Sequence, residues 1–180
     1  MLRFNTRQVY KQLRSQDIQV PWFRIFCGNT ARPRALITLW IACHGKLPTR
    51  SRLCRFGIVN YATCCFCLKD ETIDHILFEC KDTRQIWQKV LDWLGVPHDP
   101  KPWSDELCWL IQQCKGKSVR AAMLKLALAE TVYGVWQFRN SISFRKEMDA
   151  ARVVSNILDV IVYRSWASLK LRPHVAQLMI

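Results

Sequence analysis

The sequence lacks a long hydrophobic run. Its longest uncharged apolar stretch extends only from Ala35 to Cys43, whereas a helix that crosses a bilayer needs about 20 consecutive apolar residues. The N-terminus also lacks an apolar segment followed by a small-residue cleavage site, which is the pattern of a secretory signal peptide. We therefore expect a soluble protein that is neither membrane-bound nor secreted and that resides in the nucleus or the cytoplasm.

Acidic residues are scarce as well. The chain contains 27 Lys and Arg but only 14 Asp and Glu, so its net charge is +13. Most of this excess lies in residues 1–60, where eleven basic residues face one acid, Asp17, for a local net charge of +10. Such asymmetry favours a polyanionic partner, with nucleic acid first. The alternatives are a solvated face or a surface complementary to an acidic domain.

Alternating, strand-like patterns are almost absent, whereas helical periods recur along the chain. Half of the residues are hydrophobic and eight are Trp, so we expect an all-α fold of six or seven helices around an aromatic core. The expected helices lie within residues 1–14, at 33–44, 49–57 and 82–95, from 104 to about 114, from 118 to about 146, and from 149 to a point before Pro173.

Several residues are expected to shape these helices. Pro33 suits a first helical turn, and the residues expected to cap the later helices are Thr49, Asp82 (paired with Gln85), Ser104 and Asp149. Ser118 is expected to begin the longest helix. The helix over 33–44 is apolar nearly all round and is expected to be buried. Gly134 lies inside a predicted helix, where glycine costs about 1 kcal/mol relative to Ala. Close approach of another helix would explain a glycine at this position, and we expect such an approach. Five cysteines in apolar surroundings are expected in the core: Cys27, Cys43, Cys54, Cys108 and Cys114.

The remaining cysteines lie in one segment, residues 64–80. Its spacing is C-x2-C-x7-H-x4-C, formed by Cys64, Cys67, His75 and Cys80. Three thiolates and one imidazole suit a tetrahedral zinc ion, and four protein ligands leave no open position for water. The pattern therefore predicts one structural Zn²⁺ whose binding energy folds the loop.

Other interpretations of these cysteines remain open. A Cys-x2-Cys pair can be a redox site, although that motif normally joins a strand to a helix in a βαβ unit. Free thiols or a disulfide are further alternatives, but the absence of a signal peptide favours a reducing compartment. Cys65 could replace Cys64 as a ligand; the two-residue spacing favours Cys64 with Cys67 and leaves Cys65 as a packed or spare thiol.

Several segments together resemble a known family, the reverse-transcriptase zinc-binding domain at the C-terminal end of plant LINE-type retrotransposon polyproteins. The resemblance rests on residues 4–10, 33–40, 47–53 and 57–58, on Cys64, Cys67, Glu71-Thr72, His75 and Cys80 with Trp87, and on residues 136–140 with Phe144. It implies that Cys64, Cys67, His75 and Cys80 are the zinc ligands. The enzymes in such polyproteins use an aromatic-x-Asp-Asp motif or acidic clusters, whereas this chain has no Asp-Asp pair. We therefore expect a detached, non-catalytic module.

The sequence predicts three parts of the chain, with the internal boundary at its cluster of three prolines. Residues 1–95 would form the zinc-binding domain, residues 96–103 a linker that contains three prolines, and residues 104–180 a C-terminal helical region.

Three functions compete at this stage. The first is binding of RNA or an RNA/cDNA duplex, with Arg50, Arg52 and Arg55 contacting phosphates and Phe66 available for base stacking. The second is a protein-interaction or scaffolding module that docks on a reverse transcriptase polymerase domain. A thiol-dependent enzyme is the third, and no His–Asp constellation supports it. We expect no small-molecule substrate.

Overall fold

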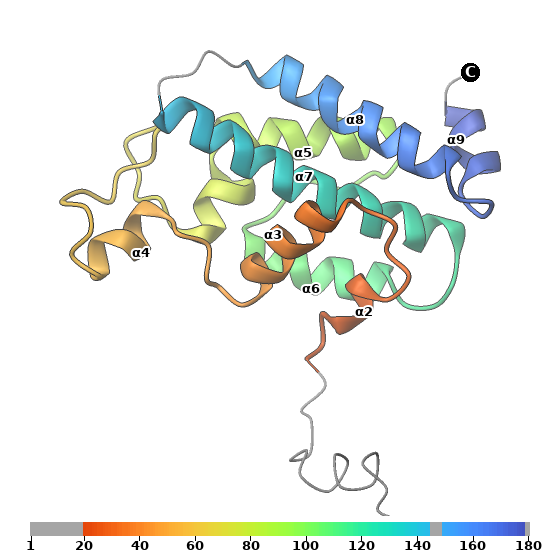
Figure 1. The fold of residues 1–180 in the computed structure, drawn as a ribbon, viewed down its shortest axis with the longest axis horizontal. Coiled ribbons are helices and arrows are strands. Elements are labelled where there is room, and N and C mark those ends of the chain that lie inside the picture. The colour runs from red at the N-terminus through yellow and green to blue at the C-terminus, as the bar shows by residue number, and fades with distance from the viewer. Residues whose placement is uncertain (1–19, 145–148, 179–180) are drawn as a thin grey trace, which may run out of the picture.

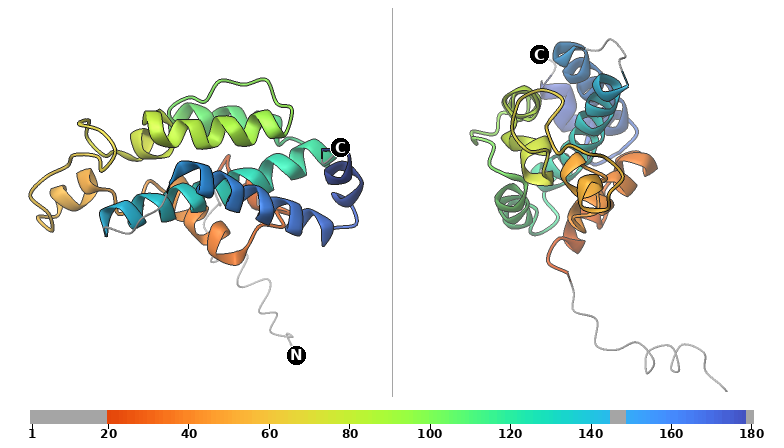
Figure 2. Two further views of the ribbon diagram at one scale, coloured as in Figure 1. Left: turned by 90° about the horizontal axis from the view of Figure 1, so that it is seen from above. Right: turned by 90° about the vertical axis from the view of Figure 1, so that its left-hand side faces the viewer.

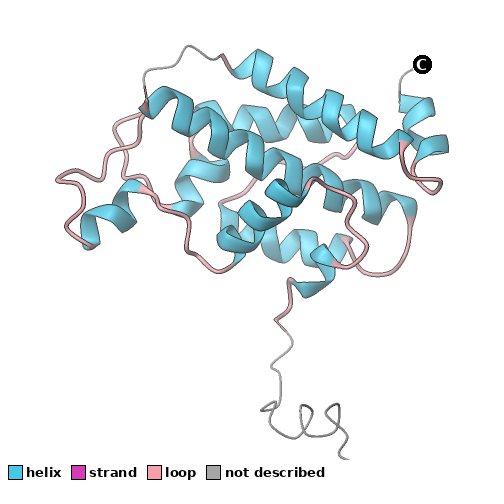
Figure 3. Ribbon diagram, in the orientation of Figure 1, coloured by secondary structure: helices cyan, strands magenta, loops and turns pink. Residues whose placement is uncertain are grey.

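The computed structural model describes residues 20–144 and 149–178, and this part of the chain is helical. Within it no strand forms, and Thr63 and Asp70 make an isolated β-bridge, so the all-α prediction is confirmed (Figure 3). The predicted helix within residues 1–14 lies outside the described residues. In order, the elements are α2 (Phe23–Phe26), α3 (Pro33–Cys43), α4 (Arg50–Arg55), a π-helical turn η1 (His75–Glu79), α5 (Lys81–Trp93), α6 (Trp103–Gln113), α7 (Val119–Ser143), α8 (Ala150–Trp166) and α9 (Arg172–Leu178).

Helix α7 is the central element of the fold. It packs against α8, α3, α5 and α6 (Figures 1 and 2). Its apolar side chains surround the helix instead of forming a stripe, and most of them are buried, from Leu124 to Val135. A helix that is hydrophobic all round needs neighbours on every side. No helix among the described residues is both long enough and apolar enough to cross a membrane.

Gly134 marks a place where α8 lies close to the backbone of α7. A Cβ atom at this position would lie 2.6 Å from Ile157 Cδ1 of α8. Real Cβ atoms do not tolerate such a contact because protein interiors are close-packed. The predicted close approach of a second helix at Gly134 is therefore confirmed.

Side-chain caps are present at Thr49 and Asp149, as predicted, and at Ser118, the predicted start of the longest helix. Thr49 Oγ1 accepts a hydrogen bond from the Arg52 amide at 3.4 Å, Ser118 Oγ accepts one from Ala121 at 3.1 Å, and Asp149 Oδ1 accepts one from Arg152 at 2.7 Å. Pro33 lies in the first turn of α3, as predicted. Each cap satisfies one backbone N–H that the helix itself leaves without an acceptor.

Two predicted caps and one helix end are wrong. Helix α5 begins at Lys81, directly after the zinc loop, with Cys80 as its N-cap and Asp82 within its first turn. Helix α6 begins one residue before Ser104, whose own amide donates to Asp74 Oδ1 at 2.8 Å. The last predicted helix is two helices: α8 ends at Trp166, and α9 contains Pro173 in its first turn, where a missing N–H costs nothing.

The expected burial of α3 and of five cysteines is also partly wrong. Helix α3 buries Ala35, Leu39 and Ala42, whereas Ile37 is 60% and Trp40 49% exposed. The small alanines allow this helix to lie close to α7, and the bulky side chains then fall on the outer face. Of the cysteines expected in the core, only Cys114 is buried; Cys43 and Cys54 are half-buried, and Cys27 and Cys108 are exposed.

The segment 96–102 has no regular secondary structure, and contacts with Glu106 of α6 fix it in place. The buried carboxylate of Glu106 accepts hydrogen bonds from Trp87 Nε1 at 2.7 Å and from the Lys101 amide at 3.0 Å, and lies 2.9 Å from His98 Nε2. One hydrophobic core includes residues from both sides of this segment, for example Leu39, Trp87, Leu128 and Ile157. The division at 95 and 104 stays a prediction.

Candidate metal centre

The first half of the predicted zinc motif lies on a tight hairpin. Glu71 N donates to Ala62 O at 2.7 Å and Cys64 N to Lys69 O at 2.8 Å, which closes the loop between them. Inside it, the Phe66 amide points at Cys64 Sγ from 3.5 Å. An amide directed at sulfur favours the thiolate, which is the form that binds metal.

The second half of the motif lies on η1. The Cys80 amide donates to His75 O at 2.7 Å, an i to i+5 bond that defines a π turn. Five residues of an α-helix turn through roughly 500°, which would direct the side chains of His75 and Cys80 to different faces. The wider π turn brings them together. Thr72 begins this turn by accepting the His75 amide with its hydroxyl at 3.1 Å.

The hairpin and the π turn bring all four predicted residues into one cluster. The ligand atoms of Cys64, Cys67, His75 and Cys80 lie within 4.8 Å of one another, and Cys67 Sγ is 3.1 Å from His75 Nε2. Around a tetrahedral zinc with Zn–S bonds of about 2.3 Å, the sulfurs are roughly 3.8 Å apart. The donor set and its spacing therefore fit one structural zinc ion. Such an ion would cross-link the hairpin to η1.

The crowded thiols influence one another's protonation. Hydrogen bonds from the Cys65 and Cys80 thiols, together with the nearby amides, lower the pKa of Cys64. The bond to Cys64 in turn raises the pKa of Cys65 and of Cys80, and burial adds to both shifts. Among these three thiols, hydrogen bonding thus favours the thiolate at Cys64. A bound dication would favour loss of the remaining protons.

Cys65 occupies an ambiguous place beside this cluster. Its Sγ lies 3.9 Å from Arg139 O on α7, and it forms a second potential donor group with Cys64 and Glu71. That alternative contains a carboxylate already engaged by Arg139, whereas the group of Cys64 with Cys67, His75 and Cys80 contains three soft sulfur donors and one imidazole. The geometry therefore favours Cys65 as a packed thiol next to the zinc ligands.

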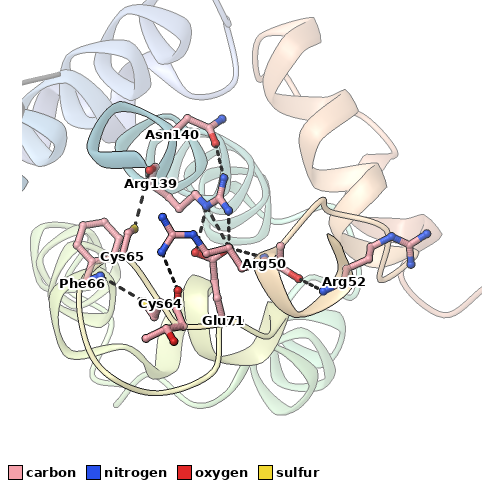
Figure 4. Close-up of polar contacts among 10 residues, drawn as sticks. Arg50, Arg52, Cys64, Cys65, Phe66, Glu71, Arg139 and Asn140 are labelled. Carbon is pink, nitrogen blue, oxygen red and sulfur yellow. Dashed lines mark hydrogen bonds and ion pairs between the residues drawn. The ribbon is translucent and has the colours of Figure 1, made fainter. Parts of the chain in front are cut away.

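Sequence reasoning assigned no role to Glu71 or Arg139, and the structure joins them (Figure 4). Glu71, fully buried, accepts from Arg139 Nη2 at 2.6 Å and from Nε at 3.1 Å. The same carboxylate accepts the Arg50 amide at 2.8 Å. Glu71 thus ties the metal loop to α7 and to the start of α4. The signal was present in the sequence as two short segments, Glu71-Thr72 and Arg139-Asn140, but only the fold brings them together.

The three arginines predicted to bind nucleic acid are not equivalent. Arg50 is half-buried: its guanidinium donates to Thr63 O at 2.7 Å and lies over the Tyr61 ring. Its guanidinium is therefore already engaged within the protein, and its contact with phosphate stays a prediction. Arg52 lies over the Phe56 ring, and Arg55 is exposed.

Phe66 is not the exposed aromatic residue that was predicted. Its ring packs against Phe138 of α7, with centroids 4.8 Å apart. The exposed aromatic side chains of this region are Phe56, at 63%, and Tyr61, at 56%. Phe66 therefore anchors the hairpin to α7.

Comparison with known proteins supports the assignment of the metal loop. Residues 4–87 match the family model described as zinc-binding in reverse transcriptase, whereas no curated protein and no solved structure matches the chain. The matched segment contains the whole cluster and ends in α5 at Trp87. The zinc-binding domain is distinct from the polymerase domain that carries catalysis. Residues 4–87 are therefore similar to the zinc-binding domains of reverse transcriptases, which supports the resemblance seen in the sequence.

Proposed function

We propose that the chain is a non-catalytic, zinc-stabilised module that binds nucleic acid, RNA or an RNA/cDNA duplex, through the edge formed by α4 and the loop that follows it. The resemblance to LINE-type polyproteins of plants supports an origin in a retrotransposon reverse transcriptase. The function would be carried by electrostatic contacts to phosphates, with zinc holding the adjacent loop rigid.

The observation that carries this proposal is the environment of the Arg52 and Arg55 side chains. Neither takes part in an ion pair among the described residues, and both line a groove of about 550 Å³ whose wall also includes the hydroxyl residues Thr49 and Ser51. One acidic residue, Asp70, lines the groove as well. Arginines without carboxylate partners are available to phosphates.

Exposed aromatic rings beside these arginines favour the binding of single-stranded nucleic acid over duplexes. Phe56 and Tyr61 lie next to the guanidinium groups of Arg52 and Arg50 and expose more than half of their surface. Proteins that bind single strands combine a basic groove with aromatic side chains on which bases stack, and each stacked base contributes about 1–3 kcal/mol. Arg50 would hold Tyr61 in place instead of contacting phosphate.

The test compares two doubly neutralised variants. Arg52→Gln with Arg55→Gln removes the proposed phosphate contacts, whereas Lys89→Gln with Arg152→Gln removes the same charge from exposed positions on α5 and α8. For single-stranded RNA, the slope of log affinity against log salt should fall by about 1.4 in the first variant, at about 0.7 per phosphate. It should stay unchanged in the control.

Docking on a protein is the competing function, and apolar exposure at the same edge favours it. Leu68 is 96% and Ile58 66% exposed. Wild-type protein that fails to bind RNA or duplex DNA, or binds with no dependence on salt, would reject the nucleic-acid proposal. Binding of a polymerase domain that Leu68→Ser abolishes would then support the docking function.

A further inference from the structure

A second basic site lies at the start of α7, at the opposite end of this helix from the metal loop (Figure 1). A pocket of about 490 Å³ opens between the end of α2, the α6–α7 turn, the first turns of α7 and the residues before α9. Every charged side chain that lines it is a cation: Arg24, Lys117, Lys125 and Lys170. A pocket with four cations and no lining acid has a positive potential.

Lys125 is the most informative of these residues. It is only 7% exposed, and its Nζ donates to Cys27 O at 3.2 Å. An ammonium group carries three donors, and no described carboxylate forms an ion pair with this one. Burial of a charge is costly unless an opposite charge accompanies it. An anion in the pocket would offset that cost.

The backbone around the pocket also suits an anion. Ser118 caps α7 by accepting the Ala121 amide, and the first-turn amides of Val119 and Arg120 have no acceptor within the helix. The start of a helix of 25 residues carries partial positive charge. Lys170 lies beside the turn that precedes α7, because its Nζ donates to Lys117 O at 2.7 Å.

Glycine backbone forms part of the pocket wall. Gly28 and Gly116 both line it and have positive φ angles of 66° and 87°. A Cβ atom built on either residue would meet no other atom within 4 Å, so both face open space. Where no side chain covers the backbone, a ligand can approach it closely.

We infer that this pocket binds a phosphate group. The group is either that of a free phosphate compound or a backbone phosphate of nucleic acid, since both present the same oxygen atoms to the four cations and the amides. The inference does not rest on the proposed function, because that function is placed at the α4 edge and inorganic phosphate alone serves as the probe here.

The test titrates the zinc-loaded full chain with sodium phosphate, and separately with sodium chloride at the same ionic strength. Amide NMR shifts of Gly116, Ser118 and Ala122 should change saturably with phosphate only. Lys125→Met removes the buried charge at nearly constant volume and should weaken phosphate binding about tenfold or more, the loss expected for one charged hydrogen bond. The matched control, Lys115→Gln, removes an exposed charge that does not line the pocket and should bind as the wild type does.

Shifts that chloride reproduces, or a Lys125→Met protein that keeps wild-type affinity, would overturn the inference. If Lys125→Met does not fold, Lys117→Gln with Lys170→Gln, both at exposed positions, must show the same weakening. A single-stranded oligonucleotide that displaces phosphate from the pocket identifies nucleic acid as the source of the group. An oligonucleotide that leaves the phosphate shifts unchanged identifies a free phosphate compound.

Discussion

At the scale of single residues, the metal centre depends on the atoms that surround the ligands as much as on the ligands themselves. Thr72 begins the turn that carries His75, and the Phe66 amide points at Cys64 Sγ. Glu71 connects the loop to Arg139 and to the amide of Arg50. These groups orient the cluster without binding the ion, in the manner of outer-shell partners in metal sites.

Exchanging single cysteines should distinguish ligands from neighbours. Cys80→Ser should lose zinc, because a hydroxyl does not replace a thiolate on this ion. Cys65→Ser should keep one zinc per chain. Metal analysis of the purified variants measures this ratio, and X-ray absorption of the wild type should show three sulfurs and one nitrogen. Loss of zinc from Cys65→Ser would show that Cys65, and not Cys64, is the ligand.

The buried Glu71–Arg139 pair should be sensitive to loss of either partner. Arg139→Met leaves the fully buried carboxylate of Glu71 without its counter-charge, and breaking such a pair costs about 3–5 kcal/mol. Chemical denaturation of the zinc-loaded protein measures the change in the free energy of unfolding. The double variant with Glu71→Gln should recover part of the loss; a single variant as stable as the wild type would contradict the role given to this pair.

At the scale of elements, the contact between α7 and α8 is set by a residue without a side chain. Gly134 allows Ile157 to sit against the α7 backbone. The glycine lowers helix propensity by about 1 kcal/mol relative to Ala. Close packing of the two helices offsets this cost.

Gly134→Ala should therefore destabilise the protein although it improves helix propensity. The new methyl group would overlap Ile157 Cδ1 and Cγ1, and overpacking of this kind costs about 1–3 kcal/mol. Combining it with Ile157→Ala should be less damaging than the sum of the two single changes, because the overlap disappears. Thermal unfolding of the four proteins gives this coupling energy, and simple additivity would mean that the two residues do not compete for space.

At the scale of the whole molecule, the zinc-binding segment and the C-terminal helices share one core. Helix α3 packs on α7, and α5 packs on α7 and α8. The hairpin of the metal loop, by contrast, lies at one end of this bundle and is attached to α7 through Glu71 and Phe66, whereas η1 is packed in the core. Core packing therefore holds η1, and zinc would fix the hairpin to it.

A strong chelator should release the hairpin of residues 62–71 and leave the bundle folded. Hydrogen exchange should accelerate in this hairpin on zinc removal, because it buries few apolar side chains of its own, whereas η1 buries Ile76, Leu77 and Phe78 in the core. Amides in the middle of α7 and α8 should remain protected. Global loss of protection would show that the bundle depends on the metal.

A fragment of residues 1–95 tests the predicted domain boundary. Without α7 and α8, it would expose Leu39 and Trp87, both fully buried in the intact chain, and burial of such side chains contributes about 1.5–3 kcal/mol each. We expect poorly dispersed amide NMR signals even with zinc, whereas the full chain should be well dispersed. A well-dispersed spectrum from the fragment would establish 1–95 as an independent domain.

The sequence by itself determined what depends on local chemistry. Helical periods, the caps Thr49, Ser118 and Asp149 and the spacing of the zinc motif all involve residues within a few positions of one another, so the preferences of neighbouring residues decide them. Only the tertiary structure decided which faces are buried and which distant side chains meet. Ile37 and Trp40 are exposed because the alanines of α3 face α7. At the start of α6, the Ser104 amide donates to Asp74, which lies 30 residues earlier in the chain. Arg139 binds Glu71, which is 68 residues away in the sequence. Such contacts depend on how helices pack in space, which no local pattern encodes.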